Sequence, residues 1–225
     1  MNITTKNDKI VALTQSGYSL TSTEYIKEGF QIFKKDIGGF VGFTLLYIVI
    51  SVVLGLIPFI GSLISFVISP ALSFGFAIVS RKIYFGEAHS FSDFFGGFKR
   101  LGDLFFVNFL MLIMILIGFL LLIIPGIYLS IAYVFAPYIT YFYHEGSFWN
   151  NLERSRKLIS KEWFSFFIFA ILLLLLNIAG LLLLGIGMLV TLPVSAIAVY
   201  VAFEKIVGTE EEKMFDFEKT EAAAQ

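Results

Sequence analysis

The chain has 225 residues, of which 58% are hydrophobic and only 15% are charged. Soluble domains are about 25% charged, so this composition excludes almost any soluble enzyme, as well as a disordered or collagen-like chain. Sixteen basic and seventeen acidic residues give a net charge of -1, which provides no basic surface for nucleic acid. The chain has no cysteine, and its two histidines are too few for a multi-histidine metal centre. We therefore expect a membrane protein without a cofactor or a metal.

Three long stretches of the sequence contain no Asp, Glu, Lys or Arg. They cover residues 37–80, 104–144 and 163–203. One helix needs about 20 apolar residues to cross the hydrocarbon core of a bilayer, and each stretch is about twice that long. Each stretch therefore predicts two transmembrane helices joined by a tight turn.

Glycines and prolines, which break helices, place these turns. The first turn is predicted at residues 55–61, the second at Pro125 and Gly126, and the third at residues 180–187. The six predicted transmembrane helices cover residues 38–57, 60–84, 104–124, 126–144, 163–183 and 186–206. The expected fold class is an all-α membrane protein with six transmembrane helices.

The distribution of basic residues predicts the orientation in the membrane. All sixteen lysines and arginines lie near the chain ends or in the two charged loops, and the three predicted turns contain none. Because cytoplasmic segments carry the excess of Lys and Arg, we expect both termini in the cytoplasm and the protein in the bacterial inner membrane. Residues 1–21 predict a mobile cytoplasmic tail, residues 22–208 one membrane domain, and residues 209–225 an acidic cytoplasmic tail.

Regular spacings indicate an internal threefold repeat, with units at residues 22–87, 90–146 and 147–208. Each unit has a basic pair, an aromatic residue six positions after a lysine of that pair, and a proline in its second predicted helix. The basic pairs are Lys34-Lys35, Lys99-Arg100 and Arg156-Lys157. The aromatic residues are Phe40, Phe105 and Trp163, and the prolines are Pro70, Pro137 and Pro193. All three units enter the membrane from the same side, so the repeats are expected to be parallel.

Each unit also opens with a short predicted helix whose apolar residues share one face. These residues are Ile26, Phe30, Phe33 and Ile37 in the first unit, Phe91, Phe94, Phe98 and Leu101 in the second, and Phe148, Leu152 and Ile159 in the third. Thr21 with Glu24 fits a capping box, Ser90 with Asp93 marks the second start, and Ser147 marks the third. We expect these amphipathic helices to lie in the headgroup layer.

Two segments of the sequence resemble those of a known family. Residues 124–129 read Ile-Pro-Gly-Ile-Tyr-Leu, and residues 152–158 read Leu-Glu-Arg-Ser-Arg-Lys-Leu, with Trp163 following. Both resemble segments of bacterial six-helix membrane proteins related to the YciC-like family, a group similar to the membrane domain attached to some glycerophosphodiester phosphodiesterases. The resemblance covers residues 25–208 and implies the fold and topology given above. It implies no activity, because those phosphodiesterases carry their chemistry in a separate soluble barrel domain.

The sequence offers little for catalysis inside the membrane. The charge-free stretches lack the intramembrane carboxylates and basic groups that mark proton-coupled transport or catalysis. His144 and Glu145 could form an acid–base pair, with Asn108 as a third member, but we favour an interfacial anchor at a helix end. We therefore predict that the protein is not an enzyme.

Two sets of residues are candidate functional positions. Those that could bind anionic lipid headgroups are Lys34, Lys35, Lys99, Arg100, Arg154, Arg156, Lys157 and Lys161. Those that could form helix kinks or line a cavity are Pro70, Pro137, Pro193, Asn108, Asn177, Tyr133 and Tyr138. Intramembrane serines either pack helices together or line a polar cavity, and they include Ser51, Ser62, Ser65, Ser69, Ser73, Ser130 and Ser195.

Together these features favour a membrane-organising or lipid-handling accessory role. Its expected partners are membrane lipids, with other membrane proteins as a further class of partner and no nucleic acid. The alternative function is that of a facilitator or channel for a small neutral or apolar solute, through the centre of the three repeats.

Overall fold

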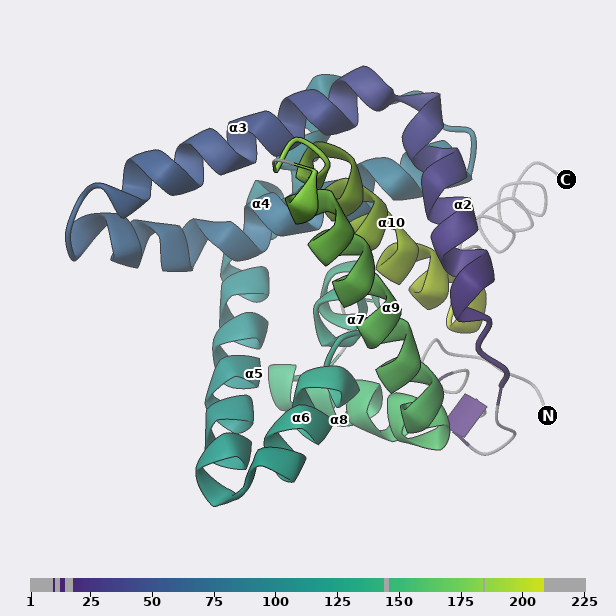
Figure 1. The fold of residues 1–225 in the computed structure, drawn as a ribbon. Helices are drawn as coiled ribbons and strands as arrows, with labels where there is room; N and C mark the ends of the chain where they lie inside the picture. Colours follow the sequence, from purple (N-terminus) through teal and green to yellow (C-terminus); the bar gives the residue numbers. More distant parts are fainter. Residues whose placement is uncertain (1–9, 11–12, 15–17, 144–145, 184, 209–225) are drawn as a thin grey trace, which may run out of the picture.

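The structure is a computed structural model that describes residues 10, 13–14, 18–143, 146–183 and 185–208. Within these ranges the chain forms helices and no strand (Figure 1). Six helical spans are long and apolar enough to cross a membrane, which confirms the predicted all-α, multi-pass architecture. The spans are Ile37–Gly55, Ile60–Tyr84, Phe91–Leu121, Ile123–Tyr143, Phe148–Leu182 and Met188–Ile206.

The two predicted tails are described only in small part. The acidic tail at residues 209–225 lies outside the described residues, as does most of the tail at residues 1–21. Ile10 is buried, and the Tyr18 hydroxyl donates a hydrogen bond to the carbonyl of Leu158, 3.0 Å away. Burial raises the pKa of Tyr18 above its ordinary value, so the phenol stays protonated. These residues pack against the membrane domain, in contrast to the mobile tail predicted for them.

The first helical hairpin follows the sequence prediction closely. It comprises the short helix α2 (Ser22–Lys35) and the long helices α3 (Ile37–Gly55) and α4 (Ile60–Tyr84). The turn occupies residues 56–59, inside the predicted range. A Cβ atom on Gly61 would overlap the carbonyl oxygen of Leu54. The close return of α4 onto α3 therefore requires glycine at position 61.

The second hairpin turns three residues earlier than predicted. It comprises the 3₁₀ helix η1 (Phe91–Arg100), α5 (Leu101–Leu121), α6 (Ile123–Ala132) and α7 (Ala136–Tyr143). The turn is made by Leu122, whose backbone is extended, and Pro125 lies within the first turn of α6. Proline fits there because the first N–H groups of a helix have no intrahelical acceptor. Gly126 packs against Phe119 of α5, where a Cβ atom would overlap the ring.

The predicted continuous helix at residues 126–144 is broken in the structure. Residues 133–135 form a turn between α6 and α7, and Pro137 is the second residue of α7. Proline cannot donate a backbone bond to the residue four positions earlier, here Tyr133, so the break falls where Pro137 is expected to disturb the helix. Pro70 and Pro193 lie inside α4 and α10, as predicted. The equivalence of the three kinks stays a prediction.

The third unit again follows the prediction. It comprises α8 (Phe148–Ile159), the short η2 (Ser160–Glu162), α9 (Trp163–Leu182) and α10 (Met188–Ile206). The turn falls between Leu182 and Met188, and Gly185 adopts a positive φ of 77° that favours glycine. The two helices approach closely beside the turn, since a Cβ atom on Gly180 would overlap the Thr191 hydroxyl.

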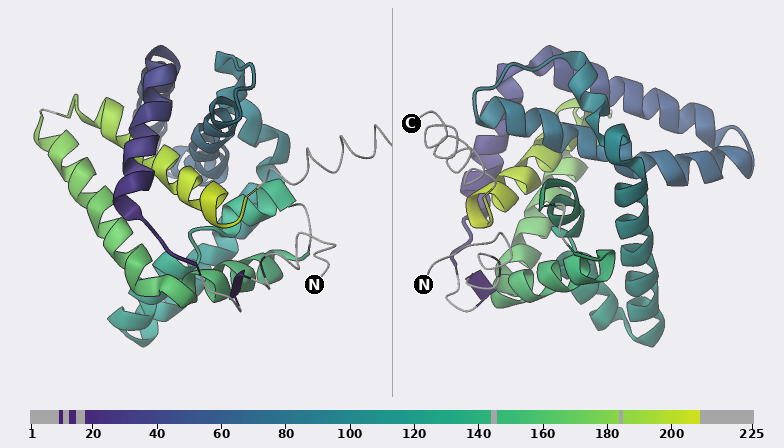
Figure 2. Two further views of the ribbon diagram at one scale, coloured as in Figure 1. Left: turned by 90° about the vertical axis from the view of Figure 1, so that its right-hand side faces the viewer. Right: turned by 180° about the vertical axis from the view of Figure 1, so that it is seen from behind.

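Each short segment packs on the second long helix of a different hairpin. Helix α2 packs on α10, η1 packs on α4, and α8 packs on α6 and α7 (Figures 1 and 2). The contacts involve small residues: Gly29 of α2 lies against Val194, and Gly97 of η1 lies against Ala71. The short segments are therefore wedged between the hairpins.

The apolar faces of the short segments turn into the protein, and their predicted place in the headgroup layer stays a prediction. In α2 the buried face is Tyr25, Gly29, Ile32 and Phe33. In η1 and α8 the buried apolar residues are Phe94, Leu152, Leu158 and Ile159. Only some of the predicted apolar positions stay exposed, namely Ile37, Phe91 and Phe98.

Two of the three predicted start signals form hydrogen bonds. The Asp93 carboxylate accepts a bond from the Ser90 N–H at 2.8 Å. The Ser147 hydroxyl accepts one from the Asn150 N–H at 3.3 Å. Thr21 makes no side-chain capping bond, so the capping box predicted at the start of α2 does not form.

Aromatic rings fill the region where α4, α7 and α10 meet. The ring of Tyr138 lies 5.2 Å from that of Phe74 and 5.2 Å from that of Phe203, measured between centroids. Phe142 packs against Phe203 at 6.1 Å and Tyr200 at 6.2 Å. The cores of the three second helices are thus joined by one aromatic cluster.

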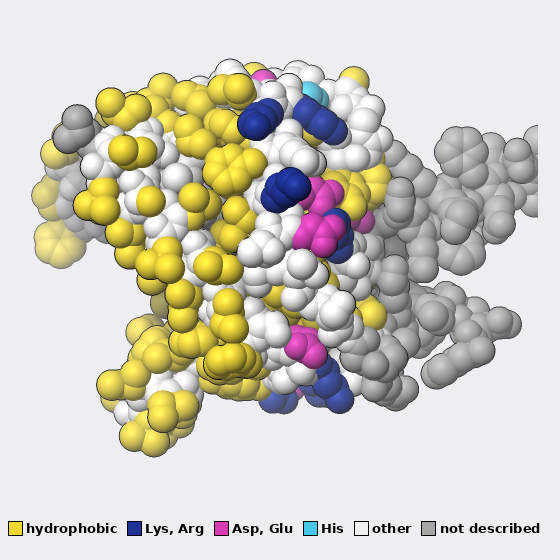
Figure 3. All heavy atoms as spheres, turned by 45° about the vertical axis from the view of Figure 1, so that its right-hand side comes forward, with side chains coloured by type: hydrophobic (Ala, Val, Ile, Leu, Met, Phe, Trp, Pro, Cys, Tyr) yellow, Lys and Arg dark blue, Asp and Glu magenta, His cyan; other side chains and the backbone are white. Residues whose placement is uncertain are grey.

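Charged and apolar side chains separate on the surface. On the face drawn in Figure 3, hydrophobic side chains cover the left part, and Lys, Arg, Asp and Glu side chains form a band to the right. Exposed large hydrophobic residues include those at the hairpin ends, such as Leu56, Phe59 and Leu182. This separation is what a helical bundle embedded in a bilayer requires.

The contact between η1 and α4 leads to a testable prediction. A Cβ atom on Gly75 of α4 would overlap the carbonyl oxygen of Phe94, whereas one on Gly102 of α5 has no neighbour within 4 Å. Gly75→Ala is expected to lower the free energy of unfolding by about 1–3 kcal/mol through overpacking. Gly102→Ala is the matched control and is expected to stay within about 0.5 kcal/mol of the natural chain. Thermal unfolding in detergent compares the two, and equal midpoints would contradict the packing described.

Candidate functional site

The eight basic candidates divide into two groups. The lysines are exposed and make no ion pair within the described part of the chain, and each lies within six residues of the start of a long helix. They are Lys34, Lys35, Lys99, Lys157 and Lys161. The three arginines are bound by neighbouring protein groups. Only the lysines are therefore available to a lipid headgroup without breaking a protein contact.

The arginines hold helices in place. Arg100 donates from Nη1 to the carbonyls of Thr140 (3.1 Å) and Tyr141 (2.6 Å), and from Nε to Asp103 (2.7 Å). It thus binds the carbonyl end of α7, where a cation is favoured by the helix dipole. Arg156 binds Glu153 through two bonds of 2.8 and 2.9 Å. Arg154 donates to the side-chain oxygen of Asn151 at 3.1 Å.

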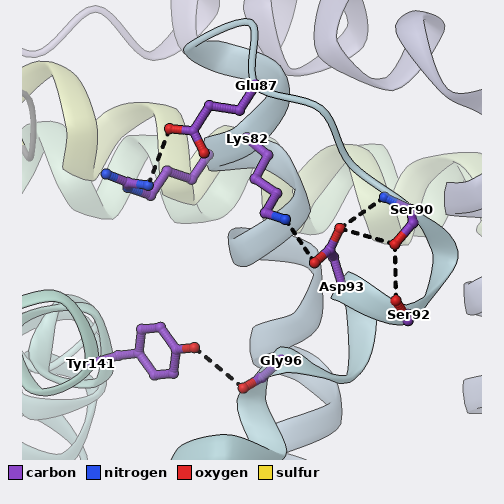
Figure 4. A network of polar contacts seen from close by, with 8 residues as sticks. Lys82, Glu87, Ser90, Ser92, Asp93, Gly96 and Tyr141 are labelled. Atoms are coloured by element: carbon purple, nitrogen blue, oxygen red, sulfur yellow. Dashed lines mark hydrogen bonds and ion pairs between the residues drawn. The ribbon is translucent and has the colours of Figure 1, made fainter.

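Further charged contacts fasten the short segments (Figure 4). Lys82 of α4 reaches Asp93 of η1 at 2.7 Å, and the Tyr141 hydroxyl donates to the carbonyl of Gly96 at 3.2 Å. Lys205 of α10 binds two carboxylates of α2 in the same way, Glu24 at 2.9 Å and Glu28 at 2.6 Å. These pairs orient the segments that carry the exposed lysines.

One buried carboxylate was not singled out from the sequence. Glu204 is only 6% exposed and accepts a hydrogen bond from the Tyr200 hydroxyl at 3.0 Å. It comes directly after the charge-free stretch that ends at residue 203, so the charge count placed it outside the membrane core. A sequence signal did exist, because Tyr200 and Glu204 lie four positions apart on one helix face.

A cleft with a serine-rich wall lies between the first hairpin and α5. Its volume is about 530 Å³, a size typical of small-molecule sites. Helices α3, α4 and α5 supply its walls. The lining residues are Tyr47, Ser51, Gly55, Ser62, Ser65, Phe66, Ser69, Pro70, Ser73, Phe105, Asn108 and Phe109. Five serines and one asparagine thus lie together within helices that are otherwise apolar.

The serine spacing explains how α4 forms one polar wall. Ser62, Ser65, Ser69 and Ser73 follow one another at intervals of three or four residues, so they share a helix face. Helix α5 faces this wall with aromatic residues. The ring centroid of Phe66 in α4 lies 5.6 Å from that of Phe105 and 6.1 Å from that of Phe109, both in α5. In Figure 1, α5 leaves this contact and runs away from the first hairpin.

Most polar groups of the cleft bond only within their own helix. The Ser51 hydroxyl donates to the Tyr47 carbonyl (2.8 Å), and the Ser73 hydroxyl to the Pro70 carbonyl (3.1 Å). Asn108 donates to the Leu104 carbonyl at 2.8 Å. Each hydroxyl oxygen and the amide oxygen can still accept a further bond. The cleft thus keeps unused hydrogen-bonding capacity.

The other predicted cavity residues do not join this cleft. Asn177 of α9 donates to Ser195 of α10 at 2.8 Å, which fastens the third hairpin. Pro193 is buried inside α10, and Tyr133 and Tyr138 pack in two separate clusters. Of the predicted set, only Pro70 and Asn108 line the cleft.

The structure bears on metal ligands only within the described residues, and the alternative acid–base pair lies outside them. Within the described residues no group of three or more His, Asp or Glu side chains is placed to hold a metal ion. His144 and Glu145 lie outside the described residues, so their relation to Asn108 stays a prediction.

No protein-family model, curated protein or solved structure matches the chain. Any functional assignment therefore has to come from the geometry of the lysines and of the cleft.

The cleft yields a prediction about water. The chain has no cysteine, so a single substituted cysteine reports one position. A thiol reacts as its thiolate, which forms where water reaches it. Ser69→Cys is therefore expected to react with a water-soluble maleimide in membranes. Leu174→Cys, on the exposed apolar surface of α9, and Ser80→Cys, which is fully buried, are expected to stay unlabelled. Equal labelling of positions 69 and 174 would show that the cleft is dry.

Proposed function

We propose that the protein is a non-enzymatic membrane-organising or lipid-handling protein whose partners are membrane lipids, with other membrane proteins as a further class. The observation that carries this proposal is the set of five exposed lysines, which lie within six residues of the start of a long helix. A lysine near the membrane surface attracts anionic headgroups with about 1 kcal/mol. Ion pairs hold α2 and η1, which carry Lys34, Lys35 and Lys99. We call the five lysines the lysine collar.

The same collar supports the proposed orientation in the bacterial inner membrane. The lysines and arginines lie away from the three hairpin turns, which carry no charge. By the positive-inside rule the collar and both termini face the cytoplasm, and the turns face the opposite side.

The proposed threefold repeat is supported by backbone geometry. Each long first helix begins after one bent residue: Asp36 (φ -147°, ψ 63°), Arg100 (φ -132°, ψ 38°) and Glu162 (φ -126°, ψ 36°). The residues four positions later are Phe40, Leu104 and Phe166, and those seven positions later are Phe43, Val107 and Phe169; all six are buried. This register replaces the one based on the basic pairs, which aligned Phe40 with Phe105 and Trp163.

The packing order also supports the repeat. The short segment of the second unit packs on the second helix of the first unit, and the third unit packs on the second in the same way. Helix α2 of the first unit packs on α10 of the third, which closes the ring. The proposed kinship with YciC-like proteins fits this architecture but is supported by the two sequence segments alone.

The alternative proposal, a facilitator through the centre of the repeats, has less support. The centre is where α4, α7 and α10 meet, and there the rings of Phe74, Tyr138 and Phe203 are in contact. A solute path along this axis would require these rings to separate.

The lipid proposal is tested with the two tryptophans, because Trp163 follows Lys161 closely and Trp149 precedes Lys157 on α8. Brominated phosphatidylglycerol is expected to quench their fluorescence more than brominated phosphatidylcholine. Each lysine is expected to strengthen binding of the anionic lipid about fivefold, which corresponds to about 1 kcal/mol. Lys157→Gln/Lys161→Gln removes both charges and is therefore expected to abolish this preference. Lys157→Arg/Lys161→Arg keeps the charge and serves as the control. If the natural chain shows no preference for the anionic lipid, the proposal fails.

The orientation has its own test. Phe59 is 90% exposed in the turn between α3 and α4, and Lys99 is exposed at the opposite end of the hairpins. Phe59→Cys is expected to react with a maleimide that cannot cross the inner membrane, in cells whose outer membrane has been permeabilised and whose inner membrane is sealed. Lys99→Cys is expected to react only after the inner membrane is opened. The reverse pattern would place the termini outside.

A further inference from the structure

We propose that the cleft between α3, α4 and α5 binds the headgroup of one uncharged, hydroxyl-bearing lipid of the diacylglycerol class, whose chains remain in the bilayer. This inference rests on the proposed lipid-handling function and adds a defined site to it. The site is separate from the lysine collar, since no lysine lines the cleft.

The charge of the lining decides the class of ligand. All polar groups of the cleft are neutral: five serine hydroxyls, the Asn108 amide and the Tyr47 phenol. An ionised headgroup placed there would give up part of its hydration and would meet no counter-charge in the lining. The neutral lining therefore favours an alcohol over a phosphate or a carboxylate.

The hydrogen-bonding pattern favours a group that both donates and accepts. The hydroxyls of Ser51 and Ser73 donate hydrogen bonds to carbonyls of their own helices, so their oxygens can act only as acceptors for a ligand. Pro70 has no N–H, so the carbonyl of Phe66 lacks its usual intrahelical donor. Asn108 retains an amide oxygen and a second N–H hydrogen for a ligand. A glycerol hydroxyl can satisfy both kinds of group.

The surroundings explain why the ligand is a lipid. The wall residues Phe66 and Phe109 and the neighbouring Leu63 are exposed on the apolar surface, so the cleft opens toward the hydrocarbon. From Ser62 to Ser73 the helix rises about 16 Å, roughly half the ~30 Å thickness of the hydrocarbon core. A polar headgroup can thus sit among the serines while acyl chains leave sideways along the phenylalanines.

A transmembrane helix of a partner or of a second copy is the main rival occupant. The four-residue spacing of Ser65, Ser69 and Ser73 is also found where membrane helices associate. A transmembrane helix already pairs its own backbone N–H and C=O groups, whereas a headgroup hydroxyl can pair with the serine and Asn108 groups that line the cleft. The observations therefore favour a small headgroup.

The test uses the full chain in phosphatidylcholine nanodiscs and fluorescent diacylglycerol as the probe. Saturable binding at one site per chain is expected. Phosphatidic acid with the same chains adds a charge, and triacylglycerol removes the hydroxyl, so both are expected to compete poorly. Ser69→Ala and Asn108→Leu are each expected to weaken binding about threefold. Ser130→Ala removes a comparable hydroxyl that bonds within α6 outside the cleft, and it is expected to bind normally.

Ser69→Phe fills the cleft and is expected to abolish diacylglycerol binding while the phosphatidylglycerol preference at the tryptophans stays intact. A matched thermal midpoint verifies that this variant is folded. Equal binding of phosphatidic acid, or undiminished binding by folded Ser69→Phe, would overturn the site and leave the lysine collar standing. A chain that is dimeric in nanodiscs and becomes monomeric on Ser69→Phe would show that a second copy occupies the cleft.

Discussion

A bilayer offers the peptide backbone no hydrogen-bond partner, and the rest of this structure depends on that constraint. Each membrane-crossing segment must satisfy its own N–H and C=O groups, so it must be helical. The same medium excludes charge, which explains why every Lys, Arg, Asp and Glu lies outside three long stretches of sequence. Gly61 and Gly180 then let the first and third hairpins return closely on themselves. The architecture is thus set by solvation before any specific contact is considered.

The charged residues left at one end act chiefly on the three short segments. A helix that merely rested on the membrane would keep its apolar face toward lipid, yet α2, η1 and α8 turn theirs into the protein. Ion pairs from Lys82 and Lys205 hold two of them at their polar edges. The three candidate arginines, like Lys82 and Lys205, therefore serve the fold, whereas the five candidate lysines remain exposed. The division follows from chemistry, because the guanidinium group can bind several carbonyls and carboxylates at once, as Arg100 does.

The sequence predicted the six spans because charge distribution and length are local properties. It failed where tertiary packing decides between local options. Pro125 and Gly126 predict a turn by propensity, but proline also fits the first turn of a helix, and the chain turns at Leu122. The serines of α4 were recognised as intramembrane polar residues, whereas the sequence could not show that Asn108 of α5 faces them. A cleft is a relation between helices, and a pattern along one helix does not contain it.

The cleft and the aromatic centre show two ways of managing polarity inside a membrane. At the centre, Phe74, Tyr138 and Phe203 exclude water by close packing. In the cleft, by contrast, hydroxyls remain accessible although apolar residues such as Phe66 and Phe109 surround them. Ser51, Ser73 and Asn108 donate hydrogen bonds within their own helices, and their oxygens keep the capacity to accept a bond from a ligand. A chain that can seal its core with rings has no physical need for an open serine-lined wall, and this contrast is the strongest reason to assign the wall to a ligand.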